Sequence, residues 1–340
     1  MALTRRQHFY RGIILLLIGL SLLYLLFWNK KVTEYSKNFF YMDTFINIKI
    51  YASDKHKVDN AFKEIDKIYD KYHKLTNRYD AYAGIKNVYY LNHELGKNEK
   101  VTIDKELYDI IKYSIDAYDQ SNGLFNIALG NAIDVWKKYR DQGDGVPTYS
   151  ELSNIGSLSI NDIILHDDYY IELANGVSID LGAISKGYVT ELVGNYLESI
   201  GLNKYIINAG GNVKVGNHYN KDKYKIGIEE PIKDSNKIYE IINANNVSVV
   251  TSGSYERYYE YNGKIYHHII DPKKLYPPTY YYAVTIITKD SRLADMLSTA
   301  LFLMPLEAGK KYIDSLPMVE AIWYDIDGNI HYSKGFDQYE

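Results

Sequence analysis

The sequence contains no cysteine. Disulfide bonds, cysteine-ligated zinc and a thiol nucleophile are therefore excluded. The sequence also lacks an excess of positive charge, because 39 Lys and Arg residues face 43 Asp and Glu residues, for a formal net charge of −4 at pH 7. Binding along a nucleic acid backbone requires a basic surface. We therefore expect no nucleic acid partner.

Two common nucleotide-binding motifs are also missing. Neither G-x-x-x-x-G-K-[ST] nor G-x-G-x-x-G occurs in the sequence, so neither a P-loop nor a dinucleotide-binding Rossmann unit is predicted. No linker rich in Pro, Ser or Gly divides the chain after residue 40, and no repeat of fixed period is visible. With 340 residues, 46% hydrophobic and 24% charged, the sequence predicts one large, two-lobed globular unit.

Charge is absent from residues 12–28, which lie close to the amino terminus. A membrane-spanning helix needs roughly 17–25 residues, so this run is just long enough. Arg5, Arg6 and Arg11 precede it, and positive charge is retained on the cytoplasmic side of membranes. The pattern predicts a single-pass membrane protein whose remaining chain lies outside the cytoplasm.

Two other interpretations of this run are less well supported by the sequence. A cleaved signal peptide is disfavoured because no small-x-small site follows the run and no cysteine can carry a lipid. A buried soluble helix is disfavoured by the terminal position and by Trp28 at the outer edge. We therefore expect a cytoplasmic tail and uncleaved anchor over residues 1–30, a linker over 31–40, and a catalytic domain over 41–340.

The rest of the chain mixes helical and strand patterns. Apolar residues at three- and four-residue spacings predict helices over 58–72 and 107–118, and residues 41–51 are typical of a strand. Further β-rich runs occupy 177–181, 205–208, 224–228, 247–250, 282–288 and 319–324. Because strands and helices do not alternate regularly, we predict an α+β fold with largely antiparallel sheets and flanking helices.

The most informative segment is 177–188, VSIDLGAISKGY, in which a predicted strand passes through Gly182 directly into a helix. Such a junction directs free backbone N–H groups and the positive end of the helix dipole at one point, which favours an anion. Lys186 lies in the first turn, where a cation suits a nearby phosphate better than the helix itself. The alternative is an ordinary turn with a solvated lysine.

Other segments carry weaker signals. Gly210 and Gly211 close a strand and would let the backbone approach a ligand, and Ser252 lies in a hydroxyl-rich loop over 251–257. His267 and His268 are adjacent on a strand-like run and must face opposite ways, so at most one reaches a given site.

A capped amphipathic helix is predicted over 290–303, with Asp290 or Ser291 at its N-cap. Asp295 and Thr299 are four residues apart and share one face of this helix. Their oxygen donors suit Mg²⁺ or Ca²⁺ rather than zinc. The same spacing also arises on ordinary solvated helix faces.

Taken in order, seven segments resemble the ApbE-like FAD:protein FMN transferase family, and the resemblance covers nearly everything after residue 40. They are 42–44 (MDT), 123–125 (GLF), 180–187 (DLGAISKG), 208–212 (NAGGN), 251–257 (TSGSYER), 268–272 (HIIDP) and 294–300 (ADMLSTA). The sequence departs from the family pattern at Asp43, where glycine is usual, and at Asn126 and Ser254, where aspartate is usual.

The resemblance implies an activity and a set of site residues. FAD would lie in a pocket, Mg²⁺ would touch its pyrophosphate, and FMN would pass to a Thr or Ser hydroxyl of a partner protein with release of AMP. The metal ligands would be the Ala183 carbonyl and the side chains of Asp295 and Thr299. The residues expected to contact the flavin nucleotide are Met42, Gly123, Phe125, Asp180, Gly182, Lys186, Gly210, Gly211, Ser252, His268 and Ile269.

The expected mechanism is attack of the partner's hydroxyl on the FMN phosphorus. Lys186 would help to neutralise charge on the pyrophosphate. His268 would accept or relay the hydroxyl proton, since an imidazole titrates near neutral pH, and Asp271 would orient it. The alternatives are an FAD pyrophosphatase, in which water replaces the hydroxyl, and a non-catalytic extracytoplasmic flavin-binding protein.

Overall fold

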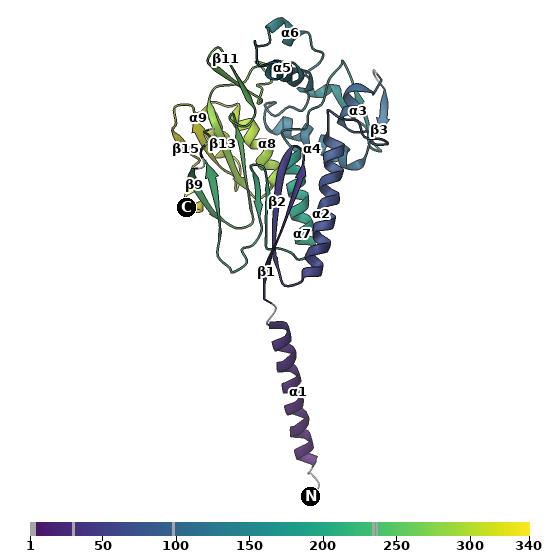
Figure 1. Cartoon of the computed structure of the whole chain (residues 1–340), viewed down its shortest axis with the longest axis vertical. Coiled ribbons are helices and arrows are strands. Elements are labelled where there is room, and N and C mark those ends of the chain that lie inside the picture. The colour runs from purple at the N-terminus through teal and green to yellow at the C-terminus, as the bar shows by residue number, and fades with distance from the viewer. Residues whose placement is uncertain (1–4, 29–30, 97–98, 233–234, 236) are drawn as a thin grey trace.

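A helix at the amino terminus, α1 (Arg5–Trp28), stands apart from the body of the protein (Figure 1). The computed structural model describes residues 5–28, 31–96, 99–232, 235 and 237–340. Within these ranges, no helix is both long and apolar enough to cross a membrane. The membrane anchor is therefore not shown by the structure and stays a prediction, and its flanks at 1–4 and 29–30 lie outside the described residues.

The body is built on an eight-stranded sheet in the order β1-β2-β6-β7-β10-β13-β14-β15. Every neighbouring pair in this sheet is antiparallel, as the sequence predicted. The strands are β1 (Thr33–Tyr41), β2 (Thr44–Ala52), β6 (Tyr205–Ala209), β7 (Asn212–Val215), β10 (Val247–Gly253), β13 (Tyr281–Thr288), β14 (Glu320–Asp325) and β15 (Ile330–Tyr332).

Helices cover one face of this sheet. These are α2 (Lys55–Thr76), α7 (Ser185–Ser199) and α8 (Ser291–Phe302), and α4 (Lys105–Gln120) packs against α2. In α2 the apolar stripe predicted from the sequence is buried, from Val58 through Ile65 to Leu75. The α8 helix packs against β10, β13 and α7, which places its buried face at the centre of the main core. Asp290 caps α8 by accepting hydrogen bonds from the next backbone N–H groups, as predicted.

The opposite face of the sheet is covered by a two-stranded sheet of β8 (Tyr224–Glu229) and β9 (Ile238–Ala244). Tyr224, Ile226 and Ile228 alternate toward the sheet and form a second core with Val249 and Ile287. Burying one side of each strand in this way gives the alternating pattern seen in β8.

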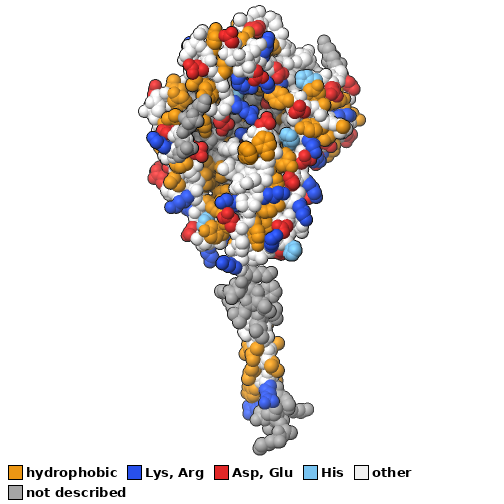
Figure 2. All heavy atoms as spheres, in the orientation of Figure 1, with side chains coloured by type: hydrophobic (Ala, Val, Ile, Leu, Met, Phe, Trp, Pro, Cys, Tyr) orange, Lys and Arg blue, Asp and Glu red, His pale blue; other side chains and the backbone are white. Residues whose placement is uncertain are grey.

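Smaller elements complete the upper part of the body in Figure 1. They are α3 (Val88–His93), α5 (Gly130–Gln142), α6 (Tyr149–Ser153), α9 (Leu306–Ile313), the sheet of β3 (Lys100–Thr102), β5 (Tyr170–Leu173) and β4 (Ile163–Leu165), and the hairpin of β11 (Tyr258–Tyr261) and β12 (Lys264–His267). A small core of Trp136, Leu152, Tyr259 and Ile270 joins α5, α6 and this hairpin. The face shown in Figure 2 carries acidic and basic side chains interspersed, with no large area of one sign.

One predicted strand is absent. Residues 177–181 are extended but form only an isolated bridge, between Ser178 and Leu129. Their backbone groups are satisfied individually: Asn92 makes two hydrogen bonds to the backbone of Ile179, and the Asp180 N–H donates to the Ile127 carbonyl. Burial in the core, and not pairing in a sheet, therefore accounts for the β-branched residues of this segment.

Candidate functional site

Two helices meet at the junction that the sequence singled out. The Gly187 N–H, in the first turn of α7, donates to the Asp295 Oδ2 of α8 at 2.7 Å. A Cβ atom at position 187 would lie 2.4 Å from the Ser291 carbonyl oxygen and 2.5 Å from the Asp295 Cβ. Real Cβ contacts are never that short, so the close approach of the two helices requires glycine at this position.

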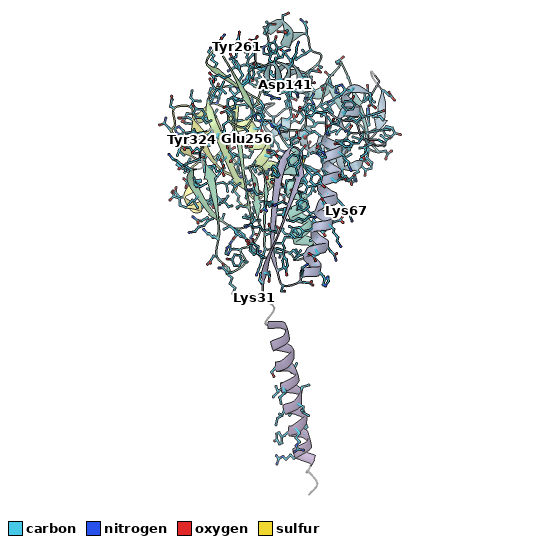
Figure 3. The ribbon with its side chains drawn as sticks, viewed as in Figure 1. Lys31, Lys67, Asp141, Glu256, Tyr261 and Tyr324 are labelled. Atoms are coloured by element: carbon cyan, nitrogen blue, oxygen red, sulfur yellow. The ribbon has the colours of Figure 1, made fainter. Side chains whose placement is uncertain are left out.

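Asp295 is buried, with 6% of its surface exposed. Burial, which outweighs the opposing effects of Lys186 and the Gly187 N–H, raises the pKa of its carboxyl group to about 6, with a smaller contribution from the nearby Glu256. Figure 3 labels Glu256, which follows β10, toward the upper end of the sheet. Within the described residues, the Asp295 Oδ1 accepts no hydrogen bond. Thr299 lies one helical turn further along α8 and is half-buried.

Lys186 links this junction to the turn between β6 and β7. Its Nζ donates to the Gly210 carbonyl oxygen at 3.3 Å. Gly210 and Gly211 form the two-residue turn with φ values of 57° and 83°, a conformation that favours glycine. A Cβ at Gly210 would lie 2.7 Å from the Thr44 Cγ2, so the first residue of β2 packs directly against it. The predicted ligand residues Lys186, Gly210 and Gly211 are thus brought together.

The turn before β2 contains Met42 and Asp43, both with positive φ, at 52° and 53°. The Met42 N–H donates to the His73 Nδ1 at 3.2 Å, which ties the hairpin tip to α2. Because β-hairpin turns of this kind favour glycine or asparagine, Asp43 adopts a conformation that glycine would adopt at less cost. The departure from the family pattern at Asp43 therefore leaves the shape of the turn unchanged.

A buried arginine that the sequence analysis missed holds the next predicted residue. Arg78, which is 5% exposed, contacts Asp180 Oδ2 through its Nη1 at 3.0 Å and Asp134 Oδ2 through its Nη2 at 2.8 Å. Burial alone would lower its pKa, but the two carboxylates raise it. The other oxygen of Asp180 accepts the Gly182 N–H at 2.7 Å, so Arg78 orients the turn that leads into α7.

The same residues are matched by a known protein family. The family model described as the ApbE family matches residues 42–323. The chain belongs to the ApbE family. It is 30% identical over 293 residues to the FAD:protein FMN transferase of Klebsiella pneumoniae, covering 85% of this chain and 88% of that one. It is 27% identical over 326 residues to the enzyme of the same name from Treponema pallidum, covering 90% and 88%.

Solved ApbE structures share the fold. The ApbE protein of Thermotoga maritima superposes with a TM-score of 0.81 at 27% identity and covers 91% of this chain and 99% of its own. The flavin transferase ApbE of Vibrio cholerae superposes with a TM-score of 0.76 at 23% identity, covering 91% and 100%. The α+β architecture with mostly antiparallel sheets is thus that of the ApbE family.

The two adjacent histidines face different surroundings, as predicted for this ApbE chain. The buried His267 ring lies 2.8 Å from the Pro278 carbonyl through its Nε2. His268 is half-buried, and its Nδ1 lies 3.3 Å from the Arg257 carbonyl. Burial, followed by the charges of His267, Arg257 and Lys186, lowers the pKa of His268 to about 3. This pKa lies well below the near-neutral value expected of an imidazole from the sequence.

Asp271 binds the backbone of the turn that follows it. Its Oδ1 accepts the N–H groups of Lys273 and Lys274, at 2.8 and 3.1 Å, so the carboxylate closes its own turn. No hydrogen bond joins Asp271 to His268 in the part of the chain that the structure describes. An aspartate one or two residues before a turn commonly binds the turn's backbone in this way.

Four other residues predicted to contact the flavin nucleotide have structural roles within the protein itself. Phe125 is 1% exposed and packs in the main core, and Ile269 is also buried there. The Ser252 hydroxyl pairs with the Ser298 hydroxyl at 2.7 Å, which joins β10 to α8 beside Asp295. Gly123 has a φ of 80° and shapes the turn after α4. Phe125 and Ile269 can therefore support a ligand site through their backbone, but their side chains belong to the core.

The predicted metal ligands fit a hard cation in their chemistry. Among the described residues, no three His, Asp or Glu side chains gather as a metal site. The predicted set contains a single carboxylate, Asp295, together with a hydroxyl and a carbonyl, and all three donate oxygen. A buried carboxylate with one oxygen free of hydrogen bonds, next to Thr299 on the same helix, suits Mg²⁺. Ala183 is exposed at the turn before α7.

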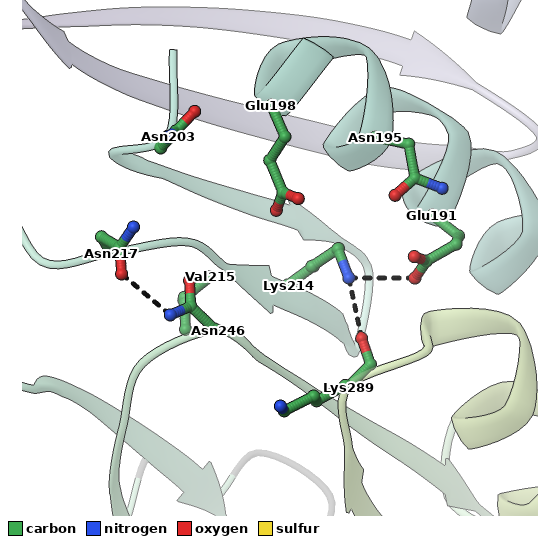
Figure 4. Close-up of a pocket in the computed structure, with 9 residues that line it drawn as sticks. All are labelled: Glu191, Asn195, Glu198, Asn203, Lys214, Val215, Asn217, Asn246 and Lys289. Atoms are coloured by element: carbon green, nitrogen blue, oxygen red, sulfur yellow. Dashed lines mark hydrogen bonds and ion pairs between the residues drawn. The ribbon is translucent and has the colours of Figure 1, made fainter. Parts of the chain in front are cut away.

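Two cavities in the described part of the chain lie away from these residues. One of about 310 Å³ lies beside the carboxyl-terminal half of α7 (Figure 4), and one of about 420 Å³ lies against α5 and α6. None of the predicted flavin or metal ligands lines either cavity.

Proposed function

We propose that this chain is an FAD:protein FMN transferase that moves FMN from FAD to a Thr or Ser hydroxyl of an acceptor protein, with Mg²⁺, and releases AMP. Its family membership and the names of its relatives support this proposal. The observation that carries it is the Asp295 carboxylate, buried against the amino-terminal end of α7 and beside Lys186. A cationic side chain, a helix amino terminus and a hard oxygen ligand together suit a pyrophosphate.

The chain's own groups have definite tasks in this reaction. No side chain caps the amino terminus of α7 at Ile184. The N–H groups of Ile184 and Ser185 donate to the Leu181 carbonyl, and that of Gly187 donates to Asp295, so the helix would act on phosphate oxygens mainly through the positive end of its dipole. The Lys186 Nζ, held at the Gly210 carbonyl, adds a positive charge beside them. Mg²⁺ held by Asp295, Thr299 and the Ala183 carbonyl would neutralise charge on the pyrophosphate.

The bonds that form and break in the transfer define the role of the acceptor hydroxyl. Its oxygen forms a bond to the phosphorus of the FMN half, and the bond from that phosphorus to the bridging oxygen breaks, so that AMP leaves with the electron pair. The hydroxyl proton passes to solvent in the same step. His268, uncharged at pH 7 because its pKa is about 3, can accept a hydrogen bond from the hydroxyl and align it. It is a weak base, so its part is mainly orientation.

The products separate this proposal from its rivals. The purified chain is incubated with FAD, Mg²⁺ and candidate acceptor proteins, and AMP and the intact mass of the acceptor are measured. The proposal expects AMP in equal amount to acceptor whose mass has risen by one FMN unit less water. AMP with free FMN and an unchanged acceptor would identify a pyrophosphatase instead. FAD binding without AMP would identify a flavin-binding protein.

We further propose that the body lies outside the cytoplasmic membrane, tethered by residues 12–28. The support is the uncharged run and the arginines Arg5, Arg6 and Arg11 before it. Protease added to intact cells should then digest the body. Amino-terminal sequencing of the mature protein that began well beyond Trp28 would reject the anchor, and protection of the body from protease would reject its export.

A further inference from the structure

A buried ion pair lies one helical turn beyond the contact between Gly187 and Asp295. The Lys214 Nζ of β7 lies 2.9 Å from the Glu191 Oε2 of α7, and their side chains are only 7% and 9% exposed. Lys214 also donates to the Lys289 carbonyl at 2.8 Å (Figure 4). The same Glu191 oxygen accepts the Ser291 N–H at 2.7 Å. One carboxylate therefore ties β7 to the first residue of α8.

Packing leaves little freedom around this pair. A Cβ at Gly194 would lie 2.6 Å from the Lys214 Cε, so the lysine stem crosses α7 in direct contact with its backbone. The Ser291 hydroxyl donates to the Asn212 Oδ1 at 2.7 Å, which adds a second link from α8 to β7. Three elements, α7, β7 and the start of α8, are thus fastened at one buried point.

The geometry of the two helices relates this point to the candidate site. Gly187 and Glu191 are four residues apart on α7, and Ser291 and Asp295 are four residues apart on α8, so each pair spans about one turn. Glu191 bonds to Ser291 while Gly187 bonds to Asp295. The helices are therefore joined by two successive contacts, and a shift of α8 at the first would displace Asp295 at the second.

We propose that Glu191 and Lys214 are positioning residues that set the register of α8 against α7 and so hold the Asp295 carboxylate at the Gly187 N–H. The proposal deepens the proposed function, on which it rests for the role of Asp295 as a metal ligand. Buried ion pairs often contribute little net stability compared with apolar replacements. Holding α7, β7 and α8 in a fixed arrangement therefore explains a pair at this position better than a gain in stability does.

The test uses the full chain and three variants. Glu191→Gln keeps the size of the side chain and can still accept the Ser291 N–H, but it loses the charge that holds Lys214. Lys214→Met leaves Glu191 buried without its partner, and Glu191→Gln/Lys214→Met removes both charges. Lys71→Met is the matched control, because the ion pair of Lys71 with Glu106 joins α2 to α4 at 2.6 Å, on the surface.

Two measurements are made on each variant. The first is amide hydrogen exchange of the peptide containing Gly187, without added metal, and the second is the Mg²⁺ concentration that gives half-maximal transfer. Loss of groups that support a metal ligand typically weakens metal affinity by 10–100-fold. We expect Glu191→Gln and the double variant to exchange faster at Gly187 and to need at least about tenfold more Mg²⁺, with turnover at saturating Mg²⁺ largely kept. Lys71→Met should change neither value.

The cavity beside the pair allows a chemical rescue. Its volume of about 310 Å³, with Lys214 and Glu191 in its lining, is ample for a small amine. Ethylammonium should therefore restore the Mg²⁺ dependence of Lys214→Ala toward that of the wild type, whereas ethanol should not. Rescue by both compounds, or by neither, would contradict a role for the charge.

Unchanged exchange at Gly187 and an unchanged Mg²⁺ requirement in the folded Glu191→Gln and double variants would overturn the proposal, even if both melted at lower temperature. If Lys214→Met fails to fold, the Glu191→Gln and double variants still test the proposal. If the wild type shows no transfer at all, the proposed function fails separately, and hydrogen exchange at Gly187 still tests whether the pair positions Asp295.

Discussion

The Gly187 N–H and the Asp295 Oδ2 are 2.7 Å apart, and this hydrogen bond joins two helices that begin about a hundred residues apart in the sequence. It leaves a carboxylate in the protein interior with one oxygen committed and a raised pKa of about 6. At pH 7 the protein therefore retains a buried negative charge at a cost in stability. A bound cation would offset that cost, so the arrangement suits a cation site better than a structural contact.

Replacing Asp295 with Asn should stabilise the metal-free protein at neutral pH. The folded-state pKa of about 6 lies above the usual value near 4, so wild-type stability falls as pH rises from about 4 to 6. At pH 7 the variant should be more stable by up to about 3 kcal/mol, and below pH 4 the difference should vanish. Urea unfolding of the full chain across this pH range measures it.

The natural control for that experiment is Asp290→Asn. Asp290 has a lowered pKa, because Arg292 and the backbone N–H groups at the start of α8 outweigh its burial. Its charge therefore stabilises the fold above the unfolded pKa, and the variant should be less stable than the wild type at pH 7. Equal effects of the two substitutions would contradict the assignment of a destabilising charge to Asp295.

The pH dependence of transfer should follow Asp295 and not His268. Protons compete with Mg²⁺ for a carboxylate of pKa about 6, so at low Mg²⁺ transfer should fall below pH 6, and excess Mg²⁺ should move this limb to lower pH. His268, with its pKa lowered to about 3, should give no inflection near pH 6.5. An inflection there that His268→Gln abolishes would show that the imidazole titrates normally.

Arg78→Met should weaken FAD use through Asp180. Removing the guanidinium leaves Asp180 and Asp134 without their shared partner and frees the turn that precedes α7. We expect the KM for FAD to rise by about tenfold or more, since breaking a buried charged pair typically costs about 3–5 kcal/mol in interactions. Arg140→Met, at a half-buried arginine 3.9 Å from Asp141, serves as the control. Steady-state kinetics with varied FAD measure this KM. Equal KM values for both variants and the wild type would contradict the link between Arg78 and FAD use.

Asp43→Gly should stabilise the hairpin tip without impairing transfer. Asp43 has a φ of 53°, which glycine adopts without a steric penalty, so the free energy of unfolding should rise by about 0.5–1 kcal/mol. Asp43→Ala should do the opposite, because alanine lacks the local hydrogen bonds that help aspartate adopt this conformation. Thermal unfolding of both variants measures the direction of each change in stability. An Asp43→Gly variant less stable than the wild type would contradict backbone strain at Asp43.

Local patterns in the sequence predicted much of this fold, because they depend on neighbours along the chain. The apolar stripe of α2, the N-cap Asp290 and the antiparallel pairing all follow from spacing and composition. The prediction of a strand over 177–181 is wrong because burial in a core favours the same β-branched residues as a sheet does.

Long-range polar contacts could not be predicted in this way. Arg78 and Asp180 are 102 positions apart, and Glu191 reaches Ser291 across 100. Nothing in the local pattern marks these residues as partners. The lowered pKa of His268 likewise arises from burial and from charges on other segments, which composition does not reveal.

The most direct test follows the mass of an acceptor protein and the release of AMP in parallel, for the wild type and for Asp295→Asn, over a range of Mg²⁺ concentrations. The account predicts that the wild type adds one FMN per AMP in a Mg²⁺-dependent manner. It predicts that the folded variant does so at most very slowly, because the charge that holds the metal is gone. Nearly normal turnover by the variant with unchanged Mg²⁺ dependence would contradict it.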